Sequence, residues 1–425
     1  MKTIVLDDDP TGTQSATAVT VLLESSADIL TDSLQNSDSV YVQTNSRSIS
    51  QSEAVALVGQ VRRDALEAAT RLHDDVRFVL RGDSTLRGHV FAESEVFASD
   101  ESIIVFVPAF PDGGRTTIDG MHLVLIDGQQ IPADQTEYAA DPVFPFAHGR
   151  LDDYVAEKSD RPGILVSLAA VRAGALADVL RDAPPGSVVL PDVSDNADIT
   201  IIAEAITTAQ LAGRDIVVRC AAPLAAALAG VASDGLLPTP LLGEPRPTLL
   251  ICGSHTQGAT RQLAPVVSIW GEPVTVDTAL VFTDIAAASD AVAISALSQL
   301  NERGLAIIMS ERIRSTEHNT LEHGRRVMEA LTAAVHVLEP KVEVVIAKGG
   351  ITSADVARIG LGARTARVLG QVLPGISVWQ FQAFDGHEIL YVVVPGNIGG
   401  PDTLTNVLAA VGFTVVSDPA VESTA

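Results

Sequence analysis

Short apolar runs rich in β-branched residues alternate with longer alanine- and leucine-rich segments along most of the chain. This alternation is typical of layered α/β domains with largely parallel sheets. The strands are predicted at residues 3–6, 18–23, 39–43, 76–80, 103–107, 163–167, 187–191, 215–219, 248–252, 273–276, 305–309, 342–347 and 390–394. The helices are predicted at residues 51–72, 169–181, 200–212, 289–301, 321–338 and 354–367.

A proline-rich segment divides this pattern. Residues 235–247 contain four prolines and two glycines, so they cannot continue a helix or a central strand. A chain of 425 residues is also too long for one ordinary core. We therefore predict two α/β domains, residues 1–238 and 246–425, with the active site in the cleft between them.

Charge and hydropathy exclude several classes of partner. The formal net charge of −25 argues against nucleic acid, which needs a basic footprint. The first apolar run is too short for a signal peptide, and the apolar stretch 221–232 is too short to span a bilayer and contains Pro223. We expect a cytoplasmic protein with no membrane partner, in which Cys220 and Cys252 are buried free thiols.

Polar residues gather where the predicted strands end, which is where open α/β sheets bind ligands. The first strand is followed by Asp7, Asp8 and Asp9. Three consecutive carboxylates repel one another unless a cation or a donor-rich ligand lies among them. Contact with Mg²⁺, hydrogen bonding to sugar hydroxyls and general-base catalysis are all open for this group, as is a simple capping turn.

The same stretch also fits the opening motif of haloacid-dehalogenase-like phosphatases, in which the first aspartate, here Asp7, is the nucleophile. That class needs a later lysine and a downstream acidic pair. Lys348 and Asp355 match this lysine and acidic pair poorly, because glycines occupy positions where the class requires carboxylates.

The strand at 76–80 leads into a second dense group of polar residues. Arg81 and Arg87 can clamp a carboxylate, and Asp83 can accept a hydrogen bond from a hydroxyl. Ser84 and Thr85 add hydroxyls within the same loop, and Arg115 follows the strand at 103–107 as a further anion contact. Together these residues predict a pocket for a small polyhydroxy acid.

Glycine loops follow three strands of the second half. One contains Gly349 and Gly350 and starts a helix with Thr352 and Ser353, which suits a phosphate at a helix N-terminus, although a purely structural turn is equally open. Lys348 can either reach a phosphate or face solvent. The other two loops contain Ser254 and the run from Gly396 through Asn397 to Gly399. Because neither a Walker A nor a dinucleotide motif is present, a nucleotide site here is of another kind.

Taken in order, these motifs resemble the four-carbon acid sugar kinases over nearly the whole chain. The motifs of the first half are Asp7-Asp8-x-x-Thr11-Gly12, Asp83-Ser84-Thr85-Leu86-Arg87-Gly88 and Pro108-Ala109-Phe110-Pro111 with Arg115. Those of the second half are Gly253-Ser254, Gly349-Gly350-x-Thr352-Ser353 and Pro395-Gly396-x-x-Gly399. The chain departs from the family where Arg81-Gly82 replaces a frequent lysine, which leaves the identity of the acid open.

The resemblance implies an N-terminal domain that binds an acid sugar and a C-terminal domain that binds ATP with Mg²⁺. It implies phosphorylation of the terminal (C4) hydroxyl of 3-oxo-tetronate, threonate or erythronate, with 3-oxo-tetronate preferred. Catalysis then falls to Asp8, Asp83 and Arg87, and substrate binding to Asp7, Arg81, Ser84, Thr85 and Arg115. ATP binding falls to Ser254, Gly349, Gly350, Thr352, Ser353, Gly396, Asn397 and Gly399. The metal ligands are not assigned, and a homodimer is kept as an option.

A second hypothesis is a non-catalytic regulator that binds a nucleotide and a sugar acid without turnover. The concentration of acidic residues after the first strand argues against it. Turnover in the presence of ATP and a four-carbon acid distinguishes the two hypotheses.

Overall fold

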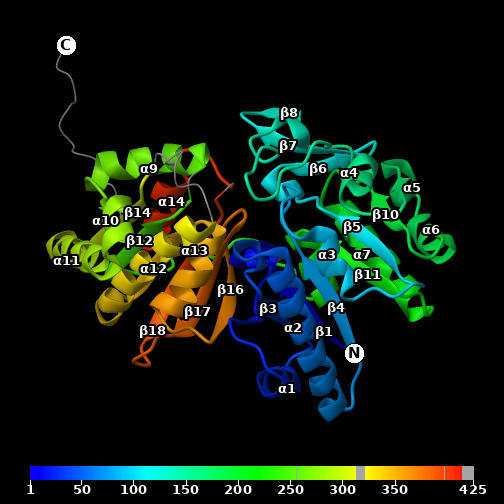
Figure 1. The fold of residues 1–425 in the computed structure, drawn as a ribbon, viewed down its shortest axis with the longest axis horizontal. Coiled ribbons are helices and arrows are strands. Elements are labelled where there is room, and N and C mark those ends of the chain that lie inside the picture. The colour runs from blue at the N-terminus through cyan, green and yellow to red at the C-terminus, as the bar shows by residue number, and fades with distance from the viewer. Residues whose placement is uncertain (255, 313–320, 397, 414–425) are drawn as a thin grey trace. The chain divides into compact units, whose positions relative to one another are not determined.

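The computed structural model describes residues 1–254, 256–312, 321–396 and 398–413. The chain forms two compact units (Figure 1). The first contains Met1–Gly235 and Ala363–Phe381, and the second contains Leu236–Gly362 and the chain from Gln382 onward. The first unit therefore includes a segment that lies within the range predicted for the second domain.

The main sheet of the first unit is parallel over most of its width. In spatial order its strands are β17 (Ile376–Gln382), β16 (Thr365–Leu373), β2 (Thr20–Leu22), β3 (Ser39–Gln43), β1 (Lys2–Asp7), β4 (Val76–Arg81), β11 (Ile216–Cys220), β5 (Ile103–Val107), β10 (Val188–Pro191) and β9 (Gly163–Val166). The strands β16 and β17 pair antiparallel, and β16 also pairs antiparallel with β2.

Helices cover this sheet and complete its core. They are α1 (Ala27–Gln35), α2 (Gln51–Leu72), α3 (Val90–Glu95), α4 (Leu151–Lys158), α5 (Leu168–Arg172), α6 (Leu176–Asp182), α7 (Asn196–Leu211) and α8 (Ala222–Ala229). Apolar residues of α1 and α2 form one buried cluster with residues of β1 and β3. The start of α2 is fixed by a capping box between Ser50 and Glu53, which satisfies free N–H groups of its first turn.

The first unit also has a small antiparallel sheet of β6 (Arg115–Ile118), β7 (Met121–Ile126) and β8 (Gln129–Pro132). These strands were not predicted. Each turn between them is an Asp-Gly pair with positive φ at both residues, at Asp119-Gly120 and Asp127-Gly128. Such pairs are the usual residues of two-residue hairpin turns.

The second unit is built on a parallel sheet in the order β13 (Val274–Val276), β14 (Leu305–Ser310), β12 (Thr248–Cys252), β15 (Val344–Lys348) and β18 (Glu388–Val394). Its helices are α9 (Gln257–Trp270), α10 (Thr278–Thr283), α11 (Ile285–Arg303), α12 (Leu321–Leu338), α13 (Gly350–Asp355) and α14 (Thr403–Ala410). Within this unit α9 packs beside α14, and α11 beside α12 (Figure 1).

Two helix predictions were wrong for a shared reason, which is a glycine with positive φ. The predicted helix 169–181 is split into α5 and α6 at Gly174 (φ +75°). The predicted helix 354–367 ends before its predicted last residue. A π-helical turn over Val356–Gly360 follows α13, and Gly362 (φ +76°) then leads toward β16. Positive φ is incompatible with a right-handed helix.

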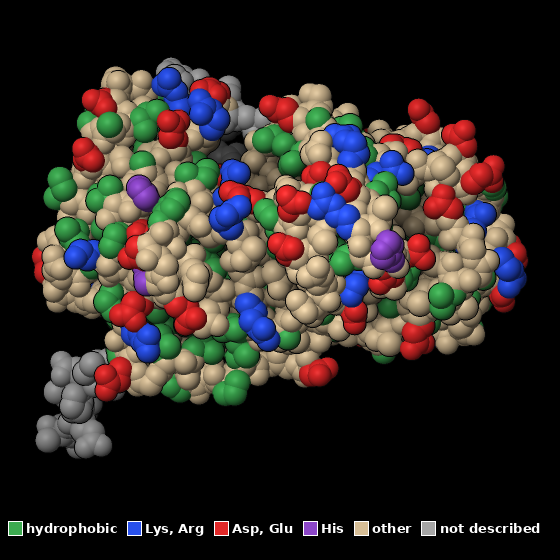
Figure 2. Space-filling model, turned by 90° about the horizontal axis from the view of Figure 1, so that it is seen from below, with side chains coloured by type: hydrophobic (Ala, Val, Ile, Leu, Met, Phe, Trp, Pro, Cys, Tyr) green, Lys and Arg blue, Asp and Glu red, His purple; other side chains and the backbone are tan. Residues whose placement is uncertain are grey.

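Acidic and basic side chains lie interspersed on the face shown in Figure 2. That face therefore presents mixed charge rather than a continuous basic stripe. Across the part of the chain that the structure describes, no helix combines the length and the apolar character needed to cross a membrane.

Candidate active site

The carboxyl edge of the main sheet in the first unit brings several strand exits together. Asp7 at the end of β1 is the register partner of Arg81 at the end of β4. The next strand, β11, ends with Arg219 and Cys220, and Cys220 is the register partner of Arg81. Residues far apart in the sequence therefore meet at this edge because the three strands are parallel neighbours.

An arginine lies among the three consecutive aspartates. Asp7, Asp8 and Asp9 are all buried, with at most 3% exposure. Nη1 of Arg81 lies 3.1 Å from Oδ1 of Asp7, 3.3 Å from Oδ1 of Asp8 and 3.2 Å from Oδ1 of Asp9. A guanidinium of the protein itself thus supplies the cation that the carboxylate run requires.

Asp8 is held by two further arginines. Nε of Arg47 lies 3.5 Å from its Oδ1, and Nη2 of Arg219 lies 3.2 Å from its Oδ2. Arg219 also pairs with the buried Glu93 of α3. With a guanidinium on each oxygen, the Asp8 carboxylate is fixed in one orientation.

Arg219 and Glu93 were not predicted as site residues. The signal available in the sequence was an arginine near the end of the otherwise apolar run Ile216–Cys220. The guanidinium has room because residue 82 is a glycine: a Cβ there would lie 2.6 Å from Nε of Arg219.

Asp83 forms the centre of a second ionic group. Its Oδ2 accepts from Nε of Arg87 at 2.7 Å and from the Thr85 hydroxyl, and Nη1 of Arg47 lies 3.4 Å away. Burial alone would raise the pKa of Asp83, but Arg87 and Arg47 outweigh it and hold that pKa well below its usual range. Asp83 is therefore a carboxylate at neutral pH.

Asp7 differs from Asp83 because burial dominates its environment. Its side chain is fully buried, and burial raises its pKa to about 7 although Arg81 opposes the shift. The backbone of Gly12 lies directly against it, since a Cβ at that position would come within 2.1 Å of both carboxylate oxygens. That Asp7 binds substrate stays a prediction; in the structure its carboxylate lies against Arg81 and Gly12.

The remaining predicted residues of the first unit lie around Arg87. The guanidinium of Arg87 lies over the Tyr138 ring, 5.1 Å from its centroid, and burial lowers the pKa of the neighbouring Arg115. The backbone oxygen of Ser84 accepts from Nε2 of His122 at 2.8 Å. Burial keeps His122 neutral by lowering its pKa to about 4, so its ring orients the Asp83–Arg87 loop without adding charge.

The three predicted glycine loops of the second unit also meet. They follow β12, β15 and β18, which are adjacent parallel strands. A Cβ on Gly253 would lie 2.1 Å from Oγ1 of Thr352, and one on Gly396 would lie 2.9 Å from Oγ of Ser254. Side chains at these positions are excluded, so the backbones of the three loops approach one another closely.

Hydroxyl and amide groups fix the shape of these loops. Gly349 has φ +118°, and Oγ of Ser353 donates to its carbonyl at 2.7 Å. Gly399 has φ +90°, and its carbonyl accepts from Nε2 of Gln262 at 3.0 Å. Gly350 is the first residue of α13. Asn397, which was predicted to contact the nucleotide, lies outside the described residues.

Lys348 is buried beneath the glycine loops and does not face solvent. Its Nζ donates to the backbone oxygen of Pro395 at 2.5 Å, so it joins the loop after β15 to the loop after β18. Burial lowers its pKa to about 7. An anion bound above these loops would favour the charged form of this lysine.

The lowered pKa of Lys348 predicts that the second unit becomes more stable as the pH rises from 7 to 8.5. At pH 7 about half of the folded chains have released this proton and at pH 8.5 nearly all have, while the unfolded chain still binds it, so unfolding grows less favourable with a slope that approaches about 1.4 kcal/mol per pH unit. The measurement is urea unfolding followed by Trp270 fluorescence in a Trp379→Phe background. Lys348→Met should remove most of this slope, and an equal slope in that variant would contradict the assignment.

The aspartates of the first unit's two ionic groups already have cationic partners within the protein. In the first unit Asp8, Asp9 and Asp83 are each paired with at least one arginine. Among the described residues, Glu339, Asp385 and His387 form a cluster of potential metal ligands, and it lies at the opposite end of β15 and β18 from the glycine loops.

Comparison with known proteins places the chain in a family. The model of a sugar-binding N-terminal domain matches residues 3–228, and the model of a nucleotide-binding C-terminal domain matches residues 249–404. A D-threonate kinase of Salmonella typhimurium is 25% identical over 434 residues, covering 96% of this chain and 98% of that protein. The chain belongs to the four-carbon acid sugar kinase family.

Other family members carry different substrate names. A D-erythronate kinase of Heliobacterium modesticaldum is 31% identical over 245 residues, covering 55% of this chain and 52% of that protein. A 3-oxo-tetronate kinase of Cupriavidus necator is 25% identical and covers 78% of this chain and 77% of that protein. The similarity thus extends to kinases of several four-carbon acids.

Solved structures show the same fold. A crystal structure of a Haemophilus influenzae protein aligns with a TM-score of 0.59 at 18% identity, covering 95% of this chain and 98% of that one. A structure of a Salmonella typhimurium protein described as a putative tRNA synthase aligns with a TM-score of 0.62 at 18% identity, covering 96% and 98%. At this identity the likeness concerns the fold.

Proposed function

We propose that this protein is an ATP-dependent kinase that phosphorylates the terminal (C4) hydroxyl of a four-carbon acid sugar, with 3-oxo-tetronate as the preferred acid. The observation that carries the proposal is the nearly full-length similarity to a D-threonate kinase. The two ionic groups of the first unit and the three converging glycine loops of the second support it. Mg²⁺ is expected to accompany ATP.

The first unit offers suitable contacts for the acid sugar. The acid carries one carboxylate and several hydroxyls, so recognition needs cations and hydrogen-bond acceptors. The guanidinium of Arg87, with its side chain 19% exposed, and that of Arg115 are candidate partners for the carboxylate. Asp8 and Asp83 are candidate acceptors for hydroxyls, and Arg81 contributes by holding the aspartates in place.

Asp8 is proposed to orient the acceptor hydroxyl or to take its proton. Phosphoryl transfer depends on holding the attacking oxygen in line and on stabilising charge at the transferred group. The guanidinium groups on both oxygens of Asp8 restrict its rotation, which favours the orienting role. Backbone N–H groups of Gly350 and Gly396 are proposed to face the phosphates of ATP, while the N–H of Gly349 donates to the backbone oxygen of Val394 at 2.9 Å and holds the loop in place.

A coupled assay of ADP formation tests the proposal with a panel of four-carbon acids. The panel contains D- and L-threonate, D- and L-erythronate and their 3-oxo forms, with glycerol as a neutral control. Turnover that requires one of the acids supports the kinase. Binding of ATP and an acid without turnover would favour the regulator, and cleavage of phosphate esters would favour the phosphatase.

The nucleotide site can be tested by substituting Gly349. Gly349→Ala places a side chain at φ +118°, which costs about 1–3 kcal/mol and displaces the loop. ATP should therefore bind at least ~10-fold more weakly, while the Kd for the acid sugar stays unchanged. Calorimetric titration of each ligand measures both constants.

The matched control is Gly243→Ala in the same unit, where an added Cβ meets open space. This variant should bind ATP like the wild type. An unchanged Kd for ATP in Gly349→Ala would remove the loop from the nucleotide site.

A further inference from the structure

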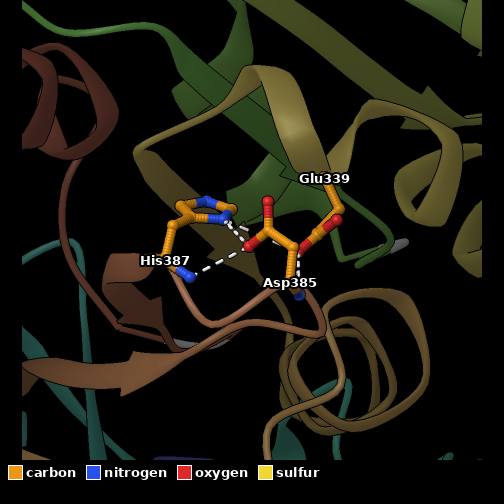
Figure 3. Close-up of side chains that lie close together, drawn as sticks. All are labelled: Glu339, Asp385 and His387. Carbon is orange, nitrogen blue, oxygen red and sulfur yellow. Dashed lines mark hydrogen bonds and ion pairs between the residues drawn. The ribbon is translucent and has the colours of Figure 1, made fainter.

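Three side chains of the second unit converge at a place that the kinase reaction does not use. Glu339 lies in a short turn ahead of β15, while Asp385 and His387 lie in the turn that leads into β18. Their potential ligand atoms all lie within 4.8 Å of one another. Figure 3 shows the Asp385 carboxylate between the His387 ring and the Glu339 carboxylate.

Hydrogen bonding fixes the tautomer of His387. Its Nε2 lies 2.9 Å from the backbone oxygen of Val342, and a carbonyl can only accept, so Nε2 carries the proton. Nδ1 contacts Oδ1 of Asp385, with which it shares a proton when the ring is charged, and lies 3.7 Å from Oε1 of Glu339. Release of that proton leaves the lone pair of Nδ1 directed at the two carboxylates, where a metal ion can replace the proton. A backbone carbonyl on the remote ring nitrogen is the usual way in which a metal-binding histidine is oriented.

The charge of this cluster is unbalanced without a cation. The Glu339 side chain is only 4% exposed, and among the described residues the ion pair recorded for it is with His387. Glu339 is a buried carboxylate and needs a compensating charge, whereas Asp385, with 49% of its side chain exposed, is partly solvated. A single proton on His387 leaves the cluster with net charge −1, whereas a divalent ion neutralises it.

We propose that Glu339, Asp385 and His387 form a binding site for a divalent transition metal ion, for which Zn²⁺ is the best match. One imidazole and two carboxylates are common zinc ligands, whereas Mg²⁺ and Ca²⁺ prefer oxygen ligands throughout. Asp385 is exposed and lies in a turn, so its side chain can move outward to admit the ion. The protein's net charge of −25 raises the local concentration of cations.

The proposed ion would join the starts of two neighbouring strands. β15 and β18 pair in parallel with Val344 opposite Leu390, and their other ends carry the glycine loops. Five residues of β15 separate the two ends, a distance of about 17 Å. The site is thus distinct from any Mg²⁺ that enters with ATP, and its expected role is to stabilise the second unit.

Calorimetric titration of Zn²⁺ into metal-free, tag-free protein, without ATP or acid sugar, tests the proposal independently of the kinase reaction. We expect one ion per chain and a rise in the urea midpoint reported by Trp270. Asp385→Asn, which keeps the shape of the side chain, and His387→Ala should each raise the Kd at least ~10-fold. His148→Ala, an exposed histidine of the first unit, should leave it unchanged.

Two outcomes would overturn the site. One is the absence of Zn²⁺ binding by the wild type, in which case the cluster is a protonated His387 between two carboxylates. The other is equal binding by the wild type and both cluster variants.

Discussion

Asp8→Asn is expected to lower the turnover number for the acid sugar by about 10²- to 10⁴-fold, the range associated with loss of a positioned acid–base group. The substitution keeps the shape of the side chain and removes the charge that faces the acceptor hydroxyl in the proposed reaction. KM should change far less than kcat, because the contacts of Arg87 and Arg115 remain. Steady-state kinetics with the preferred acid of the panel measure both constants.

The exposed residue Asp32 of α1 provides the matched control. Asp32→Asn should have wild-type kinetics. Because Asp8→Asn also leaves three arginines with one partner fewer, the fold of the variant is checked by circular dichroism and by the fluorescence of the buried Trp379. A folded Asp8→Asn enzyme with undiminished turnover would exclude Asp8 as the base and as the orienting group.

Arg219→Met is expected to destabilise the first unit by about 3–5 kcal/mol. Arg219 is 1% exposed and pairs with Glu93 and Asp8, which are also buried. Removing the arginine leaves Glu93 as a buried charge without this cation, which is far costlier than losing an exposed ion pair. The same substitution should lower turnover, since one oxygen of Asp8 loses its guanidinium.

Urea unfolding in a Trp270→Phe background isolates the first unit, because Trp379 is then the only tryptophan. The double variant Arg219→Met/Glu93→Leu should recover part of the lost stability, since it removes the unpaired carboxylate as well. A loss below about 1 kcal/mol in Arg219→Met would show that the pair is solvated in the native protein.

The elements that were predicted correctly are those marked by short-range sequence features, such as a helix cap or a short apolar run. The helix at residues 51–72 was predicted with the observed bounds because a capping serine precedes it and its periodicity is unbroken. Strands such as Ile103–Val107 were predicted because each is a short apolar run between polar loops. Each of the two wrongly predicted helices contains a glycine that has positive φ in the fold. The sequence shows the glycine but not its backbone conformation, and this conformation is what ends the helix.

The hairpin strands were missed although signals were present. β16 and β17 are joined at Pro374-Gly375, and they alternate polar and apolar residues. The strand β16 was missed because the preceding helix was predicted to continue to residue 367. The small sheet β6–β8 was missed because the segment before it is rich in proline and glycine. That composition is typical of a loop, and a loop was predicted for the whole region.

The candidate site was predictable only in its local parts. The aspartate run, the Asp83–Arg87 loop and the glycine loops are contiguous motifs, so the sequence reveals them. Arg219 contacts Asp8 across a separation of 211 residues, and only the order of β1, β4 and β11 in the sheet brings the two together. The burial of Lys348 likewise depends on the packing of the loops above it.

The inclusion of Ala363–Phe381 in the first unit has a consequence for how the protein is synthesised. The strand β2 acquires its partner β16 only after the ribosome has translated most of the second unit. Until then the nascent first unit presents an unpaired strand edge, which is a template for intermolecular pairing. Folding of the complete first unit therefore waits until residues 363–381 have been translated, and the nascent chain carries an open strand edge until then.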